Sequence, residues 1–158
     1  MKLFRTPENR REWTAAVILS ALILANLLFI FTNSMASVKD SGETSGFLAE
    51  VIKSIFPDGS AIGAFLSDNL RKIAHFAEFA SLGLLVSIYT VIFSVNRKKT
   101  APLSLVFGHF VAFFDETIQI FSGRGPMISD VWLDFSGFLT LTLITHTAAY
   151  LIRLHSER

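Results

Sequence analysis

Four apolar stretches dominate the chain, and each is about as long as a helix that crosses a membrane. They cover residues 13–31, 73–95, 103–121 and 131–152. A helix needs about 20 residues to cross a hydrocarbon core of about 30 Å. A spanning segment must satisfy its own backbone hydrogen bonds, and these stretches are far longer than barrel strands. The pattern therefore predicts an all-α bundle of four transmembrane helices, in a single domain over residues 1–158.

The composition agrees with a membrane protein. Hydrophobic residues make up 51% of the 158 residues and charged residues 17%, and the mean hydropathy is +0.51. An ordinary soluble domain is less apolar than this. The sequence contains no cysteine, which excludes a disulfide framework, a thiolate metal site and a cysteine nucleophile in this chain.

The first apolar stretch also fits a second interpretation, a cleaved secretory signal peptide. Basic residues precede the stretch, and Ser34-Met35-Ala36 is a small-x-small triplet. Its apolar run is about 20 residues long, however, whereas the apolar core of a signal peptide has about 7–15 residues. We therefore expect a retained helix.

Basic residues beside the helices predict how the chain is threaded through the membrane. Such residues favour the cytoplasmic side. Both termini are therefore expected in the cytoplasm, with residues 32–72 and 122–130 outside. Apolar residues recur every three to four positions over residues 46–56, which predicts a short amphipathic helix in the outer interface or over the mouth of the bundle. Nine of the 14 basic residues lie in the termini and the middle loop: Lys2, Arg5, Arg10, Arg11, Arg97, Lys98, Lys99, Arg153 and Arg158.

Polar side chains gather at the outer ends of three predicted helices. Each lies within about two turns of the outer boundary, at about 1.5 Å per residue. An ionised side chain in the middle of a membrane helix costs about 2.5–3.5 kcal/mol and is normally offset by partners or water. We therefore expect an outward-facing polar pocket in which Lys72 and Arg124 add positive charge. Spacings of three and four place the other members on shared helix faces: Arg71, His75 and Glu78; Asp115 and Gln119, with Glu116 beside them; Asp130 and Asp134.

Structural interpretations of these residues stay open. The two cations before the second helix can simply anchor it at the interface, and His75 and Glu78 can form a structural hydrogen-bonded pair. The two aspartates of the last helix can act as caps. Asp115 and Glu116 are harder to explain in this way, because the C-terminal end of a helix disfavours negative charge.

Two motifs resemble elements of VanZ-like membrane proteins. Residues 72–83, KIAHFAEFASLG, resemble the family element K-x-x-H-x-x-E-[YF]-x-x-L-G, and residues 115–124, DETIQIFSGR, resemble D-E-x-x-Q-x-F-x-P-G-R. The second motif is one residue shorter than the family element and lacks its proline. The serines that follow the first helix resemble a hydroxyl-rich stretch of the family, and the resemblance covers about residues 30–140.

The resemblance implies a multi-pass protein of the bacterial cytoplasmic membrane with a role in the cell envelope. The family's namesake is associated with low-level resistance to the glycopeptide teicoplanin. The resemblance implies no molecular activity, and it does not assign resistance to this chain.

Three functions fit the predicted pocket. The first is recognition of a membrane lipid or lipid-linked cell-wall precursor, whose phosphate or carboxylate oxygens would contact the cations. The second is a membrane-embedded hydrolase or transferase that acts on a lipid-linked phosphate, with a divalent metal allowed but not required. The third is a small transporter. No nucleic-acid partner is expected, and neither the oligomeric state nor a catalytic mechanism is predicted.

The residues that these hypotheses use overlap. The ligand-binding candidates are Arg71, Lys72, His75, Glu78, Asp115, Glu116, Gln119, Arg124, Asp130 and Asp134. The catalytic candidates are His75, Glu78, Asp115 and Glu116.

Overall fold

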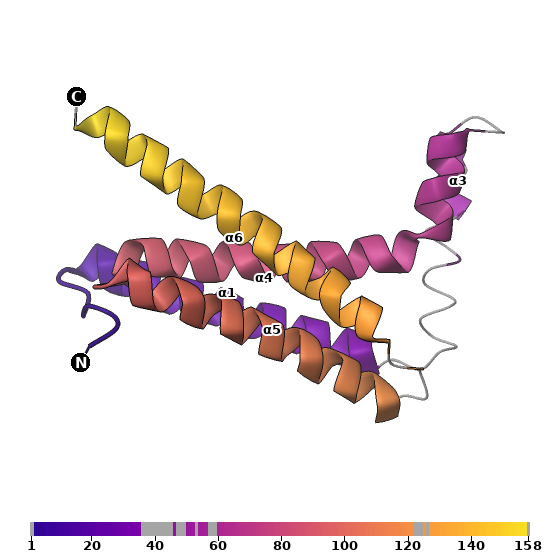
Figure 1. The fold of residues 1–158 in the computed structure, drawn as a ribbon, viewed down its shortest axis with the longest axis horizontal. Helices are drawn as coiled ribbons and strands as arrows, with labels where there is room; N and C mark the ends of the chain where they lie inside the picture. Colours follow the sequence, from indigo (N-terminus) through magenta and orange to yellow (C-terminus); the bar gives the residue numbers. More distant parts are fainter. Residues whose placement is uncertain are drawn as a thin grey trace.

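The protein is a bundle of long helices (Figure 1). The computed structural model describes residues 2–35, 46, 50–52, 54–56, 60–121, 125 and 127–157. Over these residues the helices are α1 (Arg10–Met35), α3 (Ala61–Asp68), α4 (Leu70–Phe93), α5 (Arg97–Phe121) and α6 (Ile128–Ser156). Helices α1, α4, α5 and α6 are long and apolar enough to cross a membrane. The predicted all-α bundle with four transmembrane helices is thereby confirmed.

Each long helix overlaps one predicted apolar stretch but begins earlier in the chain. The added turns, such as Leu70–Lys72 of α4, contain polar residues. An apolar pattern marks only the part of a helix that lies in hydrocarbon, whereas backbone hydrogen bonds continue the helix into the interface. The predicted end of the second stretch at residue 95 is wrong, because α4 ends at Phe93.

The N-terminal segment explains where α4 ends. The backbone N–H of Arg5 donates to the carbonyl of Phe93 at 2.8 Å, and the N–H of Val95 donates to the carbonyl of Leu3 at 3.0 Å. The Arg5 guanidinium binds both oxygens of Glu12, at 2.7 and 3.1 Å. The segment thus supplies partners for backbone groups at a helix end, which otherwise lack them.

The predicted outer segment contains a helix that the sequence pattern did not predict. In α3 the side chain of Ser60 accepts a hydrogen bond from the N–H of Gly63 at 3.2 Å and so acts as the N-cap. The predicted amphipathic helix over residues 46–56 lies partly outside the described residues. Its described positions 46, 50–52, 54 and 55 are helical.

Helices α4 and α6 make the most extensive contact between two elements. A Cβ atom on Gly83 would lie 2.2 Å from the carbonyl oxygen of Phe138, and one on Gly137 would lie 2.3 Å from the carbonyl oxygen of Phe76. Glycine therefore lets the two backbones touch, as small residues commonly do between membrane helices. The buried apolar cluster around this crossing contains Ile30, Phe79, Leu82, Val111, Ala112 and Phe138.

The crossing also sets the shape of the bundle. Helix α6 runs obliquely across α4, and its C-terminal half diverges from the other helices (Figure 1). The start of α1 and the end of α6 lie at the same end of the bundle, as four spans require. Which end faces the cytoplasm stays a prediction.

Replacing Gly83 with alanine is expected to lower the free energy of unfolding by a net of about 1–2 kcal/mol. The gain in helix propensity is about 1 kcal/mol, whereas overpacking costs about 1–3 kcal/mol and more when backbone must move. The measurement is the Tm of the purified protein in detergent. Gly46→Ala is the matched control, because its new Cβ meets no atom within 4 Å. A Tm for Gly83→Ala at or above that of the control would contradict a backbone contact at this crossing.

Candidate functional site

A polar cavity of about 190 Å³ lies where the start of α4 and the start of α6 meet the end of α5. Two predicted residues do not line the cavity: Asp115, which lies 3.7 Å from His75 Nδ1, and Glu78, whose hydrogen-bond partner is Asn33 of α1. Arg124 lies outside the described residues. The cavity is lined by Asp68, Asn69, Arg71, Lys72, His75, Glu116, Gln119, Met127, Asp130, Leu133 and Asp134, which include seven of the ten predicted ligand-binding residues.

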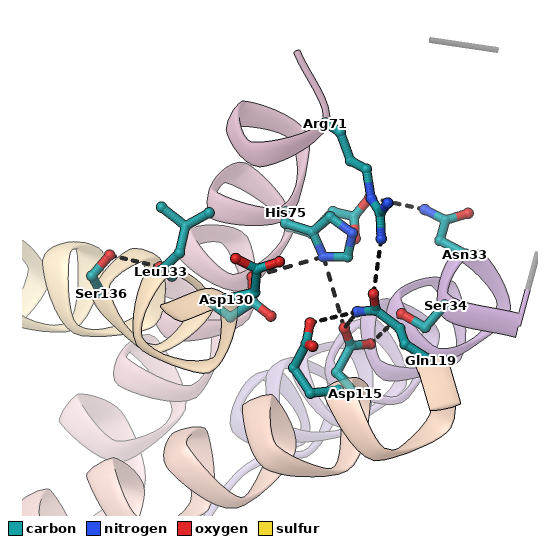
Figure 2. Close-up of polar contacts among 12 residues, drawn as sticks. Asn33, Ser34, Arg71, His75, Asp115, Gln119, Asp130, Leu133 and Ser136 are labelled. Atoms are coloured by element: carbon teal, nitrogen blue, oxygen red, sulfur yellow. Dashed lines mark hydrogen bonds and ion pairs between the residues drawn. The ribbon is translucent and has the colours of Figure 1, made fainter. Parts of the chain in front are cut away.

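The side-chain amide of Gln119 connects the charged groups. Its Nε2 donates to Asp115 Oδ2 at 2.9 Å and to Glu116 Oε1 at 2.8 Å, and its Oε1 accepts from Arg71 Nη2 at 2.8 Å. The two acids lie three and four residues before Gln119 on α5, and therefore on nearly the same helix face. Figure 2 shows Arg71 reaching across from α4 to this amide. The amide is 1% exposed, so the network is a buried one.

His75 stands between two buried aspartates of different helices. Its Nδ1 lies 3.7 Å from Asp115 Oδ2 and 3.7 Å from Asp134 Oδ1. Figure 2 shows the imidazole of His75 directed between α5 and α6. One potential donor atom from each of these three residues lies within 4.8 Å of the other two. The polar residues that were predicted to lie at the same depth on three helices are therefore close neighbours in the structure.

Helix α1 supplies two polar partners that were not among the candidate residues. The hydroxyl of Ser34 donates to Asp115 Oδ1, and Asn33 Nδ2 donates to Glu78 Oε1 at 2.8 Å. Both residues lie in the last turn of α1, beside the same end of the bundle. The available signal was the Asn-Ser pair where the hydroxyl-rich stretch begins, but nothing in its spacing names a partner on another helix. Glu78 therefore pairs with α1, and a pair between His75 and Glu78 is not observed.

The connection from α5 to α6 is held by Glu116. Its Oε2 accepts a hydrogen bond from the backbone N–H of Met127 at 3.1 Å. Met127 is the N-cap of α6 and makes no side-chain cap bond, so neither Asp130 nor Asp134 is the N-cap residue. Asp130 nevertheless lies in the first turn of α6, where the helix dipole favours a negative charge.

The two described cations face the cavity. Arg71 binds the Gln119 amide, and both Arg71 and Lys72 are exposed at the rim. Within the described residues, no lysine or arginine lies within 4.0 Å of a carboxylate oxygen of Glu78, Glu116 or Asp134. The positive charge is therefore positioned to meet a ligand at the mouth of the cavity.

An apolar groove of about 450 Å³ adjoins the polar cavity between α5 and α6. Glu116 and Met127 line both spaces. The remaining lining is mostly apolar and aromatic: His109, Phe113, Thr117, Ile120, Ile128, Val131 and Trp132. The polar cavity and the apolar groove thus meet at these two residues.

Gln119→Ala is expected to lower the free energy of unfolding by about 2 kcal/mol, because it removes hydrogen bonds from buried carboxylates. The Tm in detergent measures the change. Thr117→Ala is the matched control, since its hydroxyl binds only the Phe113 carbonyl of its own helix among the contacts described, at 2.8 Å. Equal Tm values for the two variants would contradict the bridging role of Gln119.

Comparison with known proteins gives one result. A family model described as VanZ/LLP1 matches residues 16–151. Searches of curated proteins and of solved structures found no match. The match covers most of the chain, so the protein belongs to the VanZ/LLP1 family and is a multi-pass membrane protein. The name VanZ fits the association with antibiotic resistance that the two motifs implied.

Proposed function

We propose that this member of the VanZ/LLP1 family binds the anionic head group of a membrane lipid or lipid-linked envelope precursor. The observation that carries the proposal is the junction of a polar cavity with an apolar groove at Glu116 and Met127. A lipid has the same two parts in the same order, a charged head joined to apolar chains. Among small molecules, few others need both spaces at once.

The cavity has the size and charge for a head group. Its volume of about 190 Å³ is below the range of about 300–1,000 Å³ typical for drug-sized ligands, so it suits one part of a molecule. A guanidinium has five N–H donors, and the bond to Gln119 uses one of those on Arg71. Arg71 and Lys72 can therefore donate charge-assisted hydrogen bonds to phosphate oxygens at the rim.

The carboxylates behind the rim refine the ligand class. The side chains of Glu116, Asp130 and Asp134 also line the cavity, and a carboxylate can accept hydrogen bonds from a ligand. A ligand that carries donors beyond its phosphate, such as sugar hydroxyls or an amine, would be held at both ends. A simple inorganic phosphate would meet repulsion from these acids.

The orientation and cellular setting are part of the same proposal. The basic residues at the termini and in the middle loop favour the cytoplasm, which directs the cavity toward the outer face of a bacterial cytoplasmic membrane. Lipid-linked precursors exposed on that face are then within reach of the site. Binding of such a precursor would relate the protein to glycopeptide resistance.

Arg71→Gln is expected to weaken the retention of anionic lipid about tenfold, because the loss of a charge-assisted hydrogen bond costs about 1.5–3 kcal/mol. Native mass spectrometry of the detergent-solubilised protein measures retention of added phosphatidylglycerol, phosphatidylcholine and a polyprenyl diphosphate. Arg11→Gln is the matched control, because Arg11 is exposed near the start of α1 at the other end of the bundle.

The three lipids separate the sources of the head group. Preference for the polyprenyl diphosphate indicates a precursor ligand, and preference for phosphatidylglycerol indicates an ordinary membrane lipid. Equal retention of all three lipids, or no difference between the Arg71 and Arg11 variants, would overturn the proposal.

A second candidate function is hydrolysis of a lipid-linked phosphate, and the position of His75 between two aspartates favours it. A histidine near a carboxylate can remove a proton from water, which would add to the terminal phosphorus of a polyprenyl diphosphate. Cleavage of the bridging P–O bond would give polyprenyl phosphate and inorganic phosphate. Transport is less favoured, because the buried carboxylates among the described residues, Asp115, Glu116 and Asp134, lie near the end of α5 and the start of α6.

Hydrolysis makes a separate prediction. Wild-type protein would release inorganic phosphate from a polyprenyl diphosphate, and His75→Gln would lower the rate by about 10²–10⁴-fold. A colorimetric phosphate assay on the protein in detergent measures this. His109→Gln is the matched control, since His109 packs against Trp132 and Phe135 outside the polar cavity. Absence of phosphate release from the wild type would remove this candidate and leave the binding proposal untouched.

A further inference from the structure

Three potential metal ligands converge on the inner wall of the polar cavity, one from each of three helices. They belong to His75 of α4, Asp115 of α5 and Asp134 of α6, and one donor atom from each residue lies within 4.8 Å of the other two. The aspartate side chains are 0% and 1% exposed and that of His75 is 13% exposed. A surface cluster of acids is common, but a buried one assembled from three helices is costly. A cation bound between the two aspartates would offset part of that cost.

The distances between His75 and the two aspartates are too long for hydrogen bonds and close to those between ligands of one metal ion. His75 Nδ1 lies 3.7 Å from an oxygen of each aspartate, which is longer than a hydrogen bond. Donors that bind one Zn²⁺ tetrahedrally at about 2.0–2.2 Å lie about 3.4 Å apart. Each of the two distances from His75 Nδ1 therefore exceeds the separation of zinc donors by only a few tenths of an ångström.

Asp134 provides an independent observation. Its carboxylate is buried and directed at His75, yet neither oxygen has a hydrogen-bond partner among the described residues. No described lysine or arginine lies within 4.0 Å of it either. Buried carboxylates are almost always hydrogen-bonded, paired or bound to a metal. Asp134 lacks the first two kinds of partner within the part of the chain that is described, apart from the imidazole at 3.7 Å.

We propose that His75, Asp115 and Asp134 bind a divalent metal ion through one nitrogen and two oxygen donors. Imidazole favours Zn²⁺ and its neighbours, whereas carboxylates alone favour Mg²⁺, Ca²⁺ and Mn²⁺. The mixed set is suited to Zn²⁺ first and to Mn²⁺ second. His75 and Asp134 also line the cavity, so the remaining coordination positions open toward it. Water or a phosphate oxygen can complete the shell there, as in metal sites that have an open position.

Neighbouring side chains hold the proposed ligands in place. The hydroxyl of Ser34 donates to the other oxygen of Asp115, Oδ1, and the Gln119 amide donates to Oδ2. Such outer contacts orient a ligating carboxylate and tune the affinity of a metal site. The site is therefore built from all four long helices, with α1 contributing through Ser34. This inference does not depend on what occupies the cavity.

The test measures metal binding in the absence of added lipid. Chelator-treated wild-type protein in detergent is titrated with Zn²⁺, Mn²⁺ or Mg²⁺, and the bound metal is quantified by mass spectrometry after desalting. One Zn²⁺ per chain is expected, with Mn²⁺ weaker and Mg²⁺ weakest. Co²⁺ provides a spectroscopic readout, because its visible absorption reports the donor set and the coordination number.

Graded variants assign the ligands. Asp134→Asn is expected to weaken Zn²⁺ binding by roughly 100-fold or more and Ser34→Ala by about 10-fold, since Ser34 only orients a ligand. Glu157→Gln is the matched control, because Glu157 is an exposed carboxylate at the far end of the same helix, and it should leave the affinity unchanged.

The outcomes separate this inference from the lipid proposal. Zn²⁺ binding lost in Asp134→Asn and retained in Glu157→Gln supports the site. No metal bound by the wild type, or equal binding by both variants, overturns it and indicates that the Asp134 oxygens hold a proton. If Asp134→Asn does not fold, the wild-type Zn²⁺ stoichiometry and the Co²⁺ spectrum decide, because a spectrum without imidazole and carboxylate ligation contradicts the assignment. Lipid retention is measured separately, so either proposal can fail alone.

Discussion

The backbone contact between α4 and α6 sets the geometry of the polar site. Gly137 lies against the carbonyl oxygen of Phe76, where any Cβ atom would be at 2.3 Å. Phe76 follows His75 directly on α4, and Asp134 lies three residues, about one turn, before Gly137 on α6. The contact therefore brings His75 and Asp134 to 3.7 Å and limits how far they can separate. A larger residue at Gly137 would change the chemistry of the cavity as well as the packing.

Burial of several carboxylates in a membrane bundle is the second constraint, and hydrogen bonds meet only part of its cost. Asp115 accepts from Ser34 and Gln119, and Glu116 accepts from Gln119 and Met127. These contacts join α1, α5 and the start of α6 in one network. Asp134 has no such donors among the described residues. Most of the buried carboxylates thus have hydrogen-bond donors, whereas Asp134 has none among the described residues. A buried polar group without a partner is typical of functional sites.

The same network places the functional groups at a boundary between polar and apolar surroundings. Glu116 lines the polar cavity on one side and the apolar groove on the other. A ligand with a charged head and an apolar chain can contact both without a conformational change in the helices. This arrangement is the structural basis of the proposed lipid recognition, and the proposed metal ion would lie beside the polar cavity.

Particular elements show what the sequence could predict. The four spans follow from length and apolarity, because lipid leaves a long apolar segment no alternative to the helix. Spacings of three and four correctly placed Asp115 beside Gln119 and Arg71 on the cavity side of α4 with His75. Helix α3 was missed because its short apolar pattern follows a turn signal and resembles loop sequence. A hydrogen-bonded pair of His75 and Glu78 was one open interpretation of their spacing, but the described donor to Glu78 is Asn33 of α1, and spacing within one helix does not reveal a partner on another helix.

By itself, the sequence determined the helical class, the number of spans and the helix faces that carry polar residues, because these depend on local periodicity and on transfer into lipid. Only the tertiary structure decided which faces meet. The crossing of α4 and α6 depends on glycine contacts between residues more than 50 positions apart, such as Gly83 and Phe138. The partnership of Ser34 with Asp115 is set in the same way, by the rotation of α1 against α5. Helix rotation and crossing angle come from the packing of the whole bundle, and no local pattern encodes them.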